Sequence, residues 1–464
     1  MSRRLSSLDA TFLELEDADE AAHMHIGAVM LFEARPEGPP TLDRLRSEIA
    51  HRLELLPRYR SRLTGLHVGP LRRPAWQPDP AFAIEEHVRR AALPAPGGEA
   101  ELMDWCAEYW SARLDRSRPL WEVVLLEGLE SGRWALATKT HHALVDGVGA
   151  ADAAQLLLDV SRAGSRRRTS GEPAANDTER DGVADRLGDL VRGGAQLVSH
   201  PARLLGEARA AVELVIREEL VPAPPSSLNV PIGSHRRYAV ARARLTDLKA
   251  IKSALGGTVN DVVLAAAAGG LRQLLGKRGE ELPEHGLRAM VPVNLRGAEN
   301  GTPLGNRVSS LFVHLPVCEP DPVRRYLVTA GETAELKKGA MARGGAELVT
   351  LSGLAPPILH SVLARASVGA RLFNVTITNV PGPTRPLYAF GAKLEEVLPL
   401  VPLAADHALG IAVVSYDGDV FFGLSGDARA LPDMDVLRTG IEDSIAELRA
   451  ITRHARRAGR VAAR

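Results

Sequence analysis

The chain has 464 residues, 45 % of them hydrophobic, and chains of this length usually divide their core between two domains. Lys plus Arg and Asp plus Glu both number 57, so charge gives no reason to expect nucleic acid or an anionic bilayer as the principal partner. The two cysteines, Cys106 and Cys318, are too few for a disulfide framework or a thiolate metal site, which suits a reducing cytoplasm. The first residues form no apolar signal region and no apolar run approaches about 18 residues, so we expect a cytoplasmic protein without a spanning helix.

Strand-like and helix-like segments alternate through residues 1–160. The runs at 27–32 (GAVMLF) and 121–126 (WEVVLL) are rich in β-branched and large apolar residues, which is typical of strands. Segments with helical spacing of apolar residues lie around them. This alternation predicts an α/β fold, with residues 1–160 as its first subdomain.

A polar segment follows the first subdomain. Residues 161–182 are rich in Arg, Ser, Thr, Asn, Asp and Glu, a composition that cannot fill a core. Apolar residues then keep approximate helical spacing over 187–215, across a break at Pro201. We therefore expect residues 161–235 to form an exposed linker and a helical crossover.

The α/β pattern resumes over residues 236–464, which we interpret as the second subdomain. Residues 259–275 carry Ala and Leu at helical density, whereas 311–315 and 375–378 have the composition of strands. The run at 379–383 (NVPGP) is expected to stop the last of these strands sharply.

A largely apolar stretch at 348–363 is interrupted by Pro356-Pro357. We favour packing between the subdomains as its role. Membrane contact through a kinked amphipathic segment is the alternative.

The run His141-His142-Ala143-Leu144-Val145-Asp146-Gly147 lies between a predicted strand at 134–140 and a predicted helix at 150–158. In an α/β domain, such a junction is where side chains project from a rigid sheet into a cleft. Gly147 and Gly149 permit backbone angles and close approaches that a Cβ would obstruct. We therefore expect a ligand to come near the two histidines.

An imidazole at this position suits acyl transfer to an alcohol. Its ordinary pKa of about 6.5 allows it to accept a hydroxyl proton and return it within one turnover near neutral pH. No serine elbow of the Gly-x-Ser-x-Gly type precedes a helix, and neither cysteine has an activating neighbour in the sequence. Direct attack by the acceptor is therefore favoured over an acyl-enzyme.

Other roles are open for the residues of this run. Two adjacent histidines and a carboxylate could hold a metal, but helical ligand pairs are spaced by three or four residues and neighbouring strand residues point in different directions, so we favour no metal. A structural role for His141 in shaping the turn is weighed equally with a functional one. Asp-Gly is common in turns, and for Asp146 we favour a structural salt bridge over proton transfer.

The pattern His141-His142-x-x-x-Asp146-Gly147 resembles the active-site signature of the CoA-dependent acyltransferase superfamily, which includes chloramphenicol acetyltransferase and the condensation domains of peptide synthetases. Flanking segments sharpen the resemblance to the bacterial wax ester synthase/diacylglycerol acyltransferase family, in the family's order and along almost the whole chain. They are residues 5–13 (LSSLDATFL), 24–27 (MHIG), 119–121 (PLW), 231–233 (PIG), 258–263 (TVNDVV), 292–296 (PVNLR), 305–309 (GNRVS) and 379–383 (NVPGP). One departure is Asn294, where serine is expected more often.

The resemblance implies two chloramphenicol-acetyltransferase-like α/β subdomains with mixed sheets and a tunnel between them. His142 would lie at the middle of the tunnel as the general base, with acyl-CoA entering from one side and the alcohol from the other. The implied reaction moves a long fatty acyl group from acyl-CoA, the co-substrate, to diacylglycerol or a fatty alcohol, without a further cofactor. Because such acceptors reside in bilayers or droplets, peripheral association with the inner membrane face or with lipid droplets is expected.

The resemblance also carries candidate roles beyond His142. His141, Asp146 and Gly147 belong to the catalytic motif, and Asn260, which opens the 259–275 helix, is the candidate oxyanion donor, with a plain helix cap as the alternative. Arg296 is the expected partner of Asp146, in a bridge that would tie the two halves together. The candidate substrate-binding set is Pro119, Leu120, Trp121, Asn294, Arg296 and Asn306, and a core role is at least as good an interpretation for the 119–121 segment.

Two other functions compete with this hypothesis. A carrier-protein-dependent condensation domain has the same motif, but its flanking segments fit poorly here. A catalytically silent lipid-binding or lipid-droplet protein could keep the fold, although the intact His142, Asp146 and Gly147 argue against it. The sequence predicts no oligomeric state.

Overall fold

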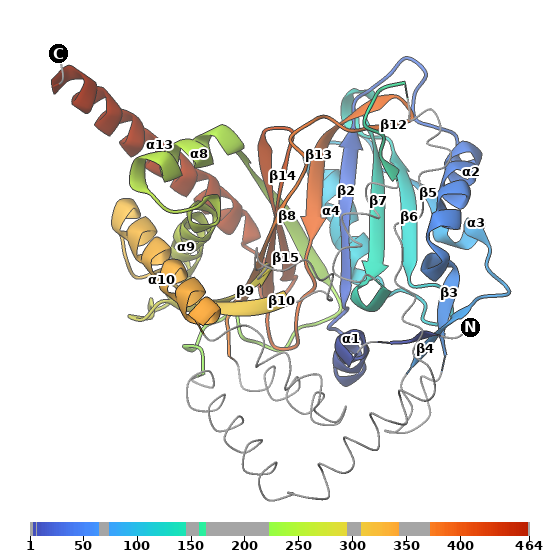
Figure 1. The fold of residues 1–464 in the computed structure, drawn as a ribbon, viewed down its shortest axis with the longest axis horizontal. Helices are drawn as coiled ribbons and strands as arrows, with labels where there is room; N and C mark the ends of the chain where they lie inside the picture. Colours follow the sequence, from blue (N-terminus) through green and yellow to red (C-terminus); the bar gives the residue numbers. More distant parts are fainter. Residues whose placement is uncertain are drawn as a thin grey trace, which may run out of the picture. The chain divides into compact units, whose positions relative to one another are not determined.

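Two six-stranded mixed sheets form the framework of the protein (Figure 1). The computed structural model describes residues 3–5, 7–64, 74–144, 157–163, 222–294, 308–342 and 372–462. Residues 1–164 and 223–464 belong to one compact unit. The α/β class expected from the sequence is confirmed.

The first sheet has the strand order β12-β13-β2-β7-β6-β5. All neighbours are antiparallel except β5 and β6. The strands from the first part of the chain are β2 (His25–Phe32), β5 (Val88–Ala92), β6 (Trp121–Glu127) and β7 (Trp134–His141). Strands β6 and β7 are buried almost throughout, which matches their largely apolar composition.

Short helices and a small three-stranded sheet accompany the first sheet. The helices are α1 (Ser7–Ala18), α2 (Leu42–Arg52), α3 (Ile84–His87) and α4 (Glu99–Ser111), and the 3-10 turns are η1 (Leu53–Leu55), η2 (Pro57–Arg60), η3 (Glu130–Gly132) and η4 (His142–Leu144). The small sheet, in the order β1-β4-β3, contains β1 (Arg3–Arg4), β3 (Ser61–Thr64) and β4 (Ala75–Pro78). The packing of α1 against η4 brings the N-terminal helix to the histidine motif.

The second sheet has the order β10-β9-β11-β14-β15-β8. Its strands are β8 (Arg236–Arg244), β9 (Leu287–Asn294), β10 (Val308–Leu315), β11 (Val375–Pro381), β14 (Leu409–Tyr416) and β15 (Asp419–Asp427). β11 runs parallel to β9 and β14, and the remaining neighbours are antiparallel.

The second sheet packs with four helices: α8 (Leu245–Leu255), α9 (Val259–Lys277), α10 (Pro322–Ala342) and α13 (Met434–Ala462). α9 is buried along most of its length, as its Ala- and Leu-rich composition predicts. It packs most closely with α13, where Gly270 faces Gly440. A Cβ at Gly440 would lie 2.9 Å from the Cα of Gly270, so larger residues would force the two helices apart.

A hairpin from the second part of the chain completes the first sheet. The subdomain boundaries expected from the sequence did not predict this exchange. β12 (Tyr388–Ala389) and β13 (Ala392–Leu400) pair with each other, and β13 pairs antiparallel with β2. Figure 1 shows β13 in orange beside the dark blue β2. The two halves of the chain are thus joined by backbone hydrogen bonds as well as by side-chain contacts.

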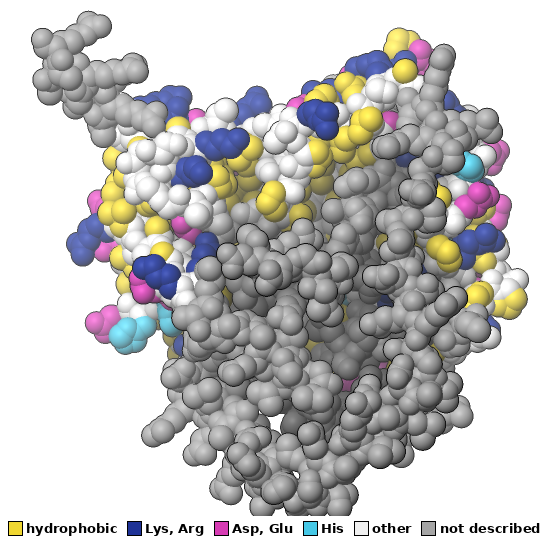
Figure 2. Space-filling view, in the orientation of Figure 1, with side chains coloured by type: hydrophobic (Ala, Val, Ile, Leu, Met, Phe, Trp, Pro, Cys, Tyr) yellow, Lys and Arg dark blue, Asp and Glu magenta, His cyan; other side chains and the backbone are white. Residues whose placement is uncertain are grey.

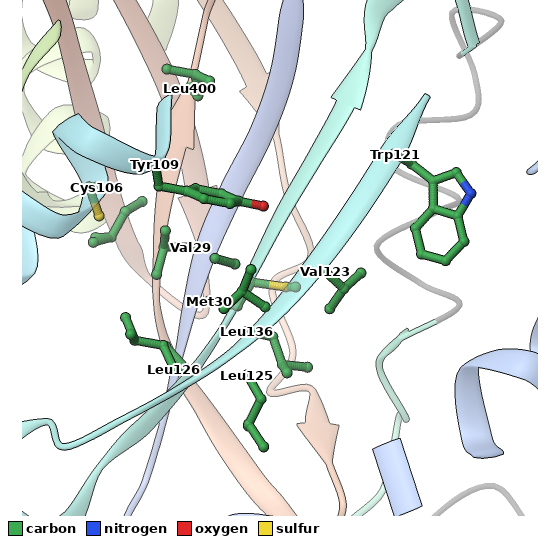
Figure 3. Packing of buried hydrophobic residues seen from close by; sticks show 14 of the residues in the cluster. Val29, Met30, Cys106, Tyr109, Trp121, Val123, Leu125, Leu126, Leu136 and Leu400 are labelled. Carbon is green, nitrogen blue, oxygen red and sulfur yellow. The ribbon is translucent and has the colours of Figure 1, made fainter. Parts of the chain in front are cut away.

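The hydrophobic core around the first sheet uses side chains from both parts of the chain. Figure 3 shows Leu400 of β13 in the same cluster as Tyr109 and Cys106 of α4 and Val29 of β2. A second cluster fills the space between the second sheet and its helices. The two large clusters of the described residues match the division of the core that the chain length led us to expect, and a small third cluster contains Ala22, Met24, Ile232, Leu403 and Ala408.

One strand end differs from the prediction. The NVPGP run was expected to stop the strand at Thr378, but β11 continues to Pro381, and Asn379, Val380 and Pro381 pair with β14. Strand β9 pairs with β11 only at Val375 and Thr376, so the residue without an N–H lies where β11 has a single partner strand. Of the linker expected at 161–182 only residues 161–163 are described, and the helices expected at 187–215 and the apolar stretch at 348–363 lie outside the described residues.

No single helix among the described residues has the length and apolarity of a membrane span. Helices α8 and α9, which are bent by 101° at their junction, reach this length and apolarity only when they are taken together. On the described part of the face shown in Figure 2, Lys and Arg side chains are interspersed with Asp, Glu and hydrophobic ones.

Candidate active site

Strand β7 and turn η4 position the two histidines of the motif. His141 is the last residue of β7, opposite His25 of β2, and His142 is the first residue of η4. The backbone N–H of His142 donates to the carbonyl of Met24 at 2.8 Å. The strand expected before the histidines is confirmed; the helix expected at 150–158 lies almost wholly outside the described residues.

The ring of His142 is partly buried against helix α1. Phe12 stacks on it, with ring centroids 3.9 Å apart and an interplanar angle of 26°. Burial lowers the pKa of His142 to about 4, and the neighbouring His141 contributes in the same direction. His142 is therefore neutral near pH 7, which is the state that a proton acceptor needs.

His141 is buried, with a hydrogen bond at one ring nitrogen and a carboxylate close to the other. The backbone N–H of Ala143 donates to its Nδ1 at 3.1 Å, and its Nε2 lies 3.3 Å from Glu16 Oε2. Since Nδ1 accepts a hydrogen bond, the ring proton resides on Nε2, facing the carboxylate. The bond to Ala143 fits the turn-shaping role, one of the two roles considered for His141, and a functional role stays a prediction.

Glu16 is a buried carboxylate at the centre of a group of basic side chains. Its exposed fraction is only 2 %. Arg116 Nε donates to Glu16 Oε2 at 3.0 Å, a second bond comes from Arg116 Nη2, and Arg113 Nη2 lies 3.7 Å away. Burial by itself raises the pKa of Glu16, but His141 and Arg116 together hold it well below its usual range. Glu16 is therefore ionised near pH 7.

Two further histidines adjoin Glu16. His25 Nε2 lies 3.6 Å from Glu16 Oε1 and accepts a hydrogen bond from the N–H of Leu114 at 3.4 Å. Burial lowers the pKa of His25 well below its ordinary value and that of His23 to about 4, so both rings are neutral near pH 7. Glu16, His23, His25, His141 and Arg116 are called the Glu16 cluster below.

A pocket of about 360 Å³ borders the Glu16 cluster and is lined by Glu20, Ala21, His23, Ser111, Arg113 and Ser234. A second pocket of about 380 Å³ lies at His285 and His314 in the other half of the chain. His142 lines neither of them, so the tunnel remains an expectation. Within the described ranges, no three His, Cys, Asp or Glu side chains are grouped as ligands for a metal ion.

The segment Pro119-Leu120-Trp121 is packed in the first core, immediately beside the motif. All three residues are buried, and the carbonyl of Leu120 accepts the N–H of His141 at 3.0 Å. Trp121 stacks on His87 with centroids 4.6 Å apart and donates from Nε1 to the carbonyl of Tyr59 at 2.7 Å. These contacts fit the core interpretation of this segment, and a role in binding substrate stays a prediction.

Asn260 lies in the first turn of α9 but does not cap the helix. Thr258 is the N-cap: its hydroxyl accepts from the N–H of Asp261, whose carboxylate in turn accepts the N–H of Thr258. The plain helix cap considered for Asn260 is therefore wrong. Its Oδ1 instead accepts a hydrogen bond from Asn379 Nδ2 at 3.1 Å, which orients the Asn260 amide with its Nδ2 as the group that can donate to a ligand.

The remaining predicted residues cannot be placed as side chains. Asp146, Gly147, Arg296 and Asn306 lie outside the described residues, so the Asp146–Arg296 bridge stays a prediction. Asn294 ends strand β9, opposite Val308 of β10, and its side chain is not described.

Sequence reasoning did not single out the residues that surround the histidines. Phe12, Met24 and His25 fall within the segments that carried the family resemblance, which was their only signal. Glu16 is one of three acidic residues in the run 14–17, and Arg116 had no signal. These residues meet only because α1, β2 and the segment after α4 converge on the end of β7.

Comparison with solved structures first defines the class of the fold. The first condensation domain of the calcium-dependent antibiotic synthetase matches with a TM-score of 0.61 and 21 % identity, over 97 % of this chain and 96 % of that one. The wax ester synthase/diacylglycerol acyltransferase from Marinobacter aquaeolei VT8 matches with a TM-score of 0.72 and 30 % identity, over 97 % and 99 %. The fold is therefore of the chloramphenicol-acetyltransferase-like, two-sheet type that the sequence predicted.

Sequence comparisons assign the family. The wax ester synthase/diacylglycerol acyltransferase catalytic domain matches residues 5–263, and the WS/DGAT C-terminal domain matches residues 304–449. The probable diacylglycerol O-acyltransferases tgs1 and tgs2 of Mycobacterium tuberculosis are 34 % and 35 % identical, covering 97 % and 95 % of this chain and 96 % and 97 % of their own lengths. The chain belongs to the wax ester synthase/diacylglycerol acyltransferase family and is an acyl-CoA-dependent O-acyltransferase.

Proposed function

We propose that the enzyme transfers a long-chain fatty acyl group from acyl-CoA to the hydroxyl of diacylglycerol, forming triacylglycerol, with His142 as the general base. His142 removes the proton of the acceptor hydroxyl as its oxygen attacks the thioester carbonyl. The tetrahedral intermediate collapses to the ester, and the departing CoA thiolate takes the proton back from His142. The reaction is balanced without a cofactor and proceeds in a ternary complex, where orientation of the two substrates lowers the barrier.

The observation that carries this proposal is the state of His142. Its ring is partly buried at the end of a rigid strand, stacked on Phe12, with a pKa lowered to about 4. A neutral imidazole has one unprotonated ring nitrogen near pH 7, and this nitrogen can take the proton of an alcohol. The alternative of a silent lipid-binding protein gives no reason for a fixed, neutral histidine at this position.

Asn260 is proposed to stabilise the oxyanion of the tetrahedral intermediate. Its amide is held by Asn379, at the N-terminal end of α9, where the helix dipole also favours negative charge. Because Thr258 and Asp261 already cap α9, Asn260 is not needed for that purpose.

The names of the relatives support diacylglycerol as the acceptor, and the name of the family supports a fatty alcohol as a second acceptor. Both acceptors carry a hydroxyl on an apolar body that resides in a bilayer or droplet. We therefore propose peripheral association with the inner membrane face or with lipid droplets. Flotation of the purified protein with liposomes tests this. If the protein floats with neither neutral nor anionic liposomes, the proposal is contradicted.

The acceptor is tested with purified protein, radiolabelled palmitoyl-CoA and either dipalmitoylglycerol or hexadecanol. We expect labelled triacylglycerol, and a smaller or equal yield of wax ester. Wax ester alone would overturn the choice of diacylglycerol. If neither ester forms while the protein still binds lipid, the lipid-binding alternative is favoured instead.

A further inference from the structure

Helix α1 contacts both histidines of the motif with one face. Phe12 and Glu16 are one helical turn apart, and residues at this spacing lie on the same side of a helix. Phe12 stacks on the ring of His142, and Glu16 lies against the ring of His141. A single element thus supplies an apolar contact to one ring and a carboxylate to the other.

The position of α1 is itself fixed by Arg116. This guanidinium binds the carboxylates of Glu16 and Asp17 and donates to the carbonyl of Leu13 at 3.4 Å. A buried carboxylate without partners would be strongly unfavourable, so the bond from Arg116 is what allows Glu16 to stay ionised beside His141. Asp17 shares the arginine but points to solvent, with 55 % of its side chain exposed.

A continuous set of hydrogen bonds and contacts leads from Glu16 to the backbone around His142. His141 Nδ1 accepts the N–H of Ala143, which leaves the ring proton on Nε2, 3.3 Å from the Glu16 carboxylate. Ala143 directly follows His142, whose own N–H is held by the carbonyl of Met24 at 2.8 Å. The backbone on both sides of His142 is therefore tied to a fixed group, and Phe12 restrains the ring.

We propose that Glu16 and Phe12 are positioning residues for acyl transfer: Glu16 acts on His142 through His141 and the η4 turn, and Phe12 acts through ring stacking. Neither is required to touch the substrates. The inference rests on the proposed role of His142 as the base, and it extends that role by naming the groups that hold the base in its reactive orientation.

The first test compares steady-state kinetics of Glu16→Gln, Glu16→Asp and Asp17→Asn. Loss of a carboxylate that orients a functional histidine is expected to lower kcat by about 10–100-fold, while KM stays within about twofold because no substrate contact is removed. Glu16→Asp keeps the charge and should recover part of this loss. Asp17→Asn is the matched control, since it removes a partner of the same arginine without touching a histidine, and its kcat should stay near that of the wild type.

The second test uses Phe12→Leu, with Phe373→Leu as its control. Phe373 stacks on His407 in the other half of the chain, at 3.8 Å and 22°, so both variants lose a stacked aromatic–histidine pair. Phe12→Leu should lower kcat several-fold at unchanged KM, whereas Phe373→Leu should affect only the thermal midpoint. If Glu16→Gln does not fold, Phe12→Leu and Glu16→Asp decide the question.

The result that overturns the proposal is unchanged kcat in folded Glu16→Gln and Phe12→Leu, or equal losses in these variants and their controls. His142→Ala distinguishes this failure from failure of the proposed function. If His142→Ala is inactive while the α1 variants are fully active, only the positioning role is wrong. If His142→Ala is active, the proposed base is wrong.

Discussion

The ends of the two sheets that carry candidate site residues are built from different chemistry. At the end of β7 in the first sheet, the Glu16 cluster gathers a carboxylate, histidines and an arginine in a buried setting. At β11 and α9 beside the second sheet, the candidate residues are two neutral amides, Asn260 and Asn379. The proposed base, His142, adjoins the first region and the proposed oxyanion donor, Asn260, lies in the second, so the proposed reaction would take a proton acceptor from one region and a neutral donor from the other.

Among variants outside the histidine motif, the largest effect is expected if the amide region takes part in the reaction. Asn260→Ala should lower kcat by about 10²–10³-fold, the loss typical of removing an oxyanion donor, with little change in thermal midpoint. The matched control is Thr258→Ala, which removes the true N-cap and should cost about 1 kcal/mol of stability at nearly normal kcat. Equal losses of stability in both variants, without a rate defect in Asn260→Ala, would confine the reaction chemistry to the first region.

The pH dependence tests which region contains the titrating base. His142 must be neutral to accept a proton, so activity is present above its pKa and lost as pH falls through it; with a pKa of about 4, the acid limb of kcat/KM should lie near pH 4 rather than 6.5. His142 and His23 have lowered pKa values in the folded protein. Their contribution to the free energy of unfolding is therefore fully present above pH 6.5 and is lost as pH falls from 6.5 towards 4. Circular dichroism at each pH separates the two effects. An acid limb near pH 6.5 in folded protein would show that burial does not control the base.

A smaller effect is expected for the residue that orients the amide. Asn379→Ala removes the hydrogen bond to Asn260 Oδ1, and kcat should fall by about tenfold while the donor itself remains. Val380→Ala, at the exposed neighbouring position of β11, is the control and should behave like the wild type. A loss as large as that of Asn260→Ala would instead assign Asn379 a direct part in the site.

The smallest effect concerns the ion pairs that link the two parts of the chain. Glu396 of β13 accepts from Arg133 Nη1 at 3.1 Å and from Arg242 Nε at 2.7 Å, so it links residues from both parts of the chain. Glu396→Gln should lower the free energy of unfolding by about 1 kcal/mol, as expected for a partly exposed ion pair, with kcat unchanged. The exposed Glu395→Gln is the control in the same thermal denaturation experiment. A clear drop in kcat would mean that this link also positions the site.

Local patterns predicted the strands and the long buried helix because their signals are contained within the elements. Strands β2, β6 and β7 and helix α9 follow from apolar composition and spacing over short windows. The insertion of β13 beside β2 could not be predicted in this way, because nothing in residues 392–400 specifies a partner strand near the N-terminus. Pairing between distant segments depends on the whole fold rather than on local sequence.

The candidate site was predictable in part for the same reason. His142 was identifiable from a motif of seven consecutive residues, whereas Glu16 acquires its significance only when α1 packs against η4. In the local sequence, Glu16 is one of several neighbouring acidic residues, which is typical of a solvent-exposed surface. Asn260 shows the opposite case: its place near the start of α9 was predicted, but the capping hydroxyl belongs to Thr258, two residues earlier.

The central claim is that His142 takes the proton from the acceptor alcohol. The most direct measurement is the kcat of His142→Ala with radiolabelled palmitoyl-CoA and diacylglycerol, in protein whose thermal midpoint matches that of the wild type. Loss of a general base is expected to reduce kcat by about 10²–10⁴-fold. Turnover close to that of the wild type in this folded variant would contradict the account.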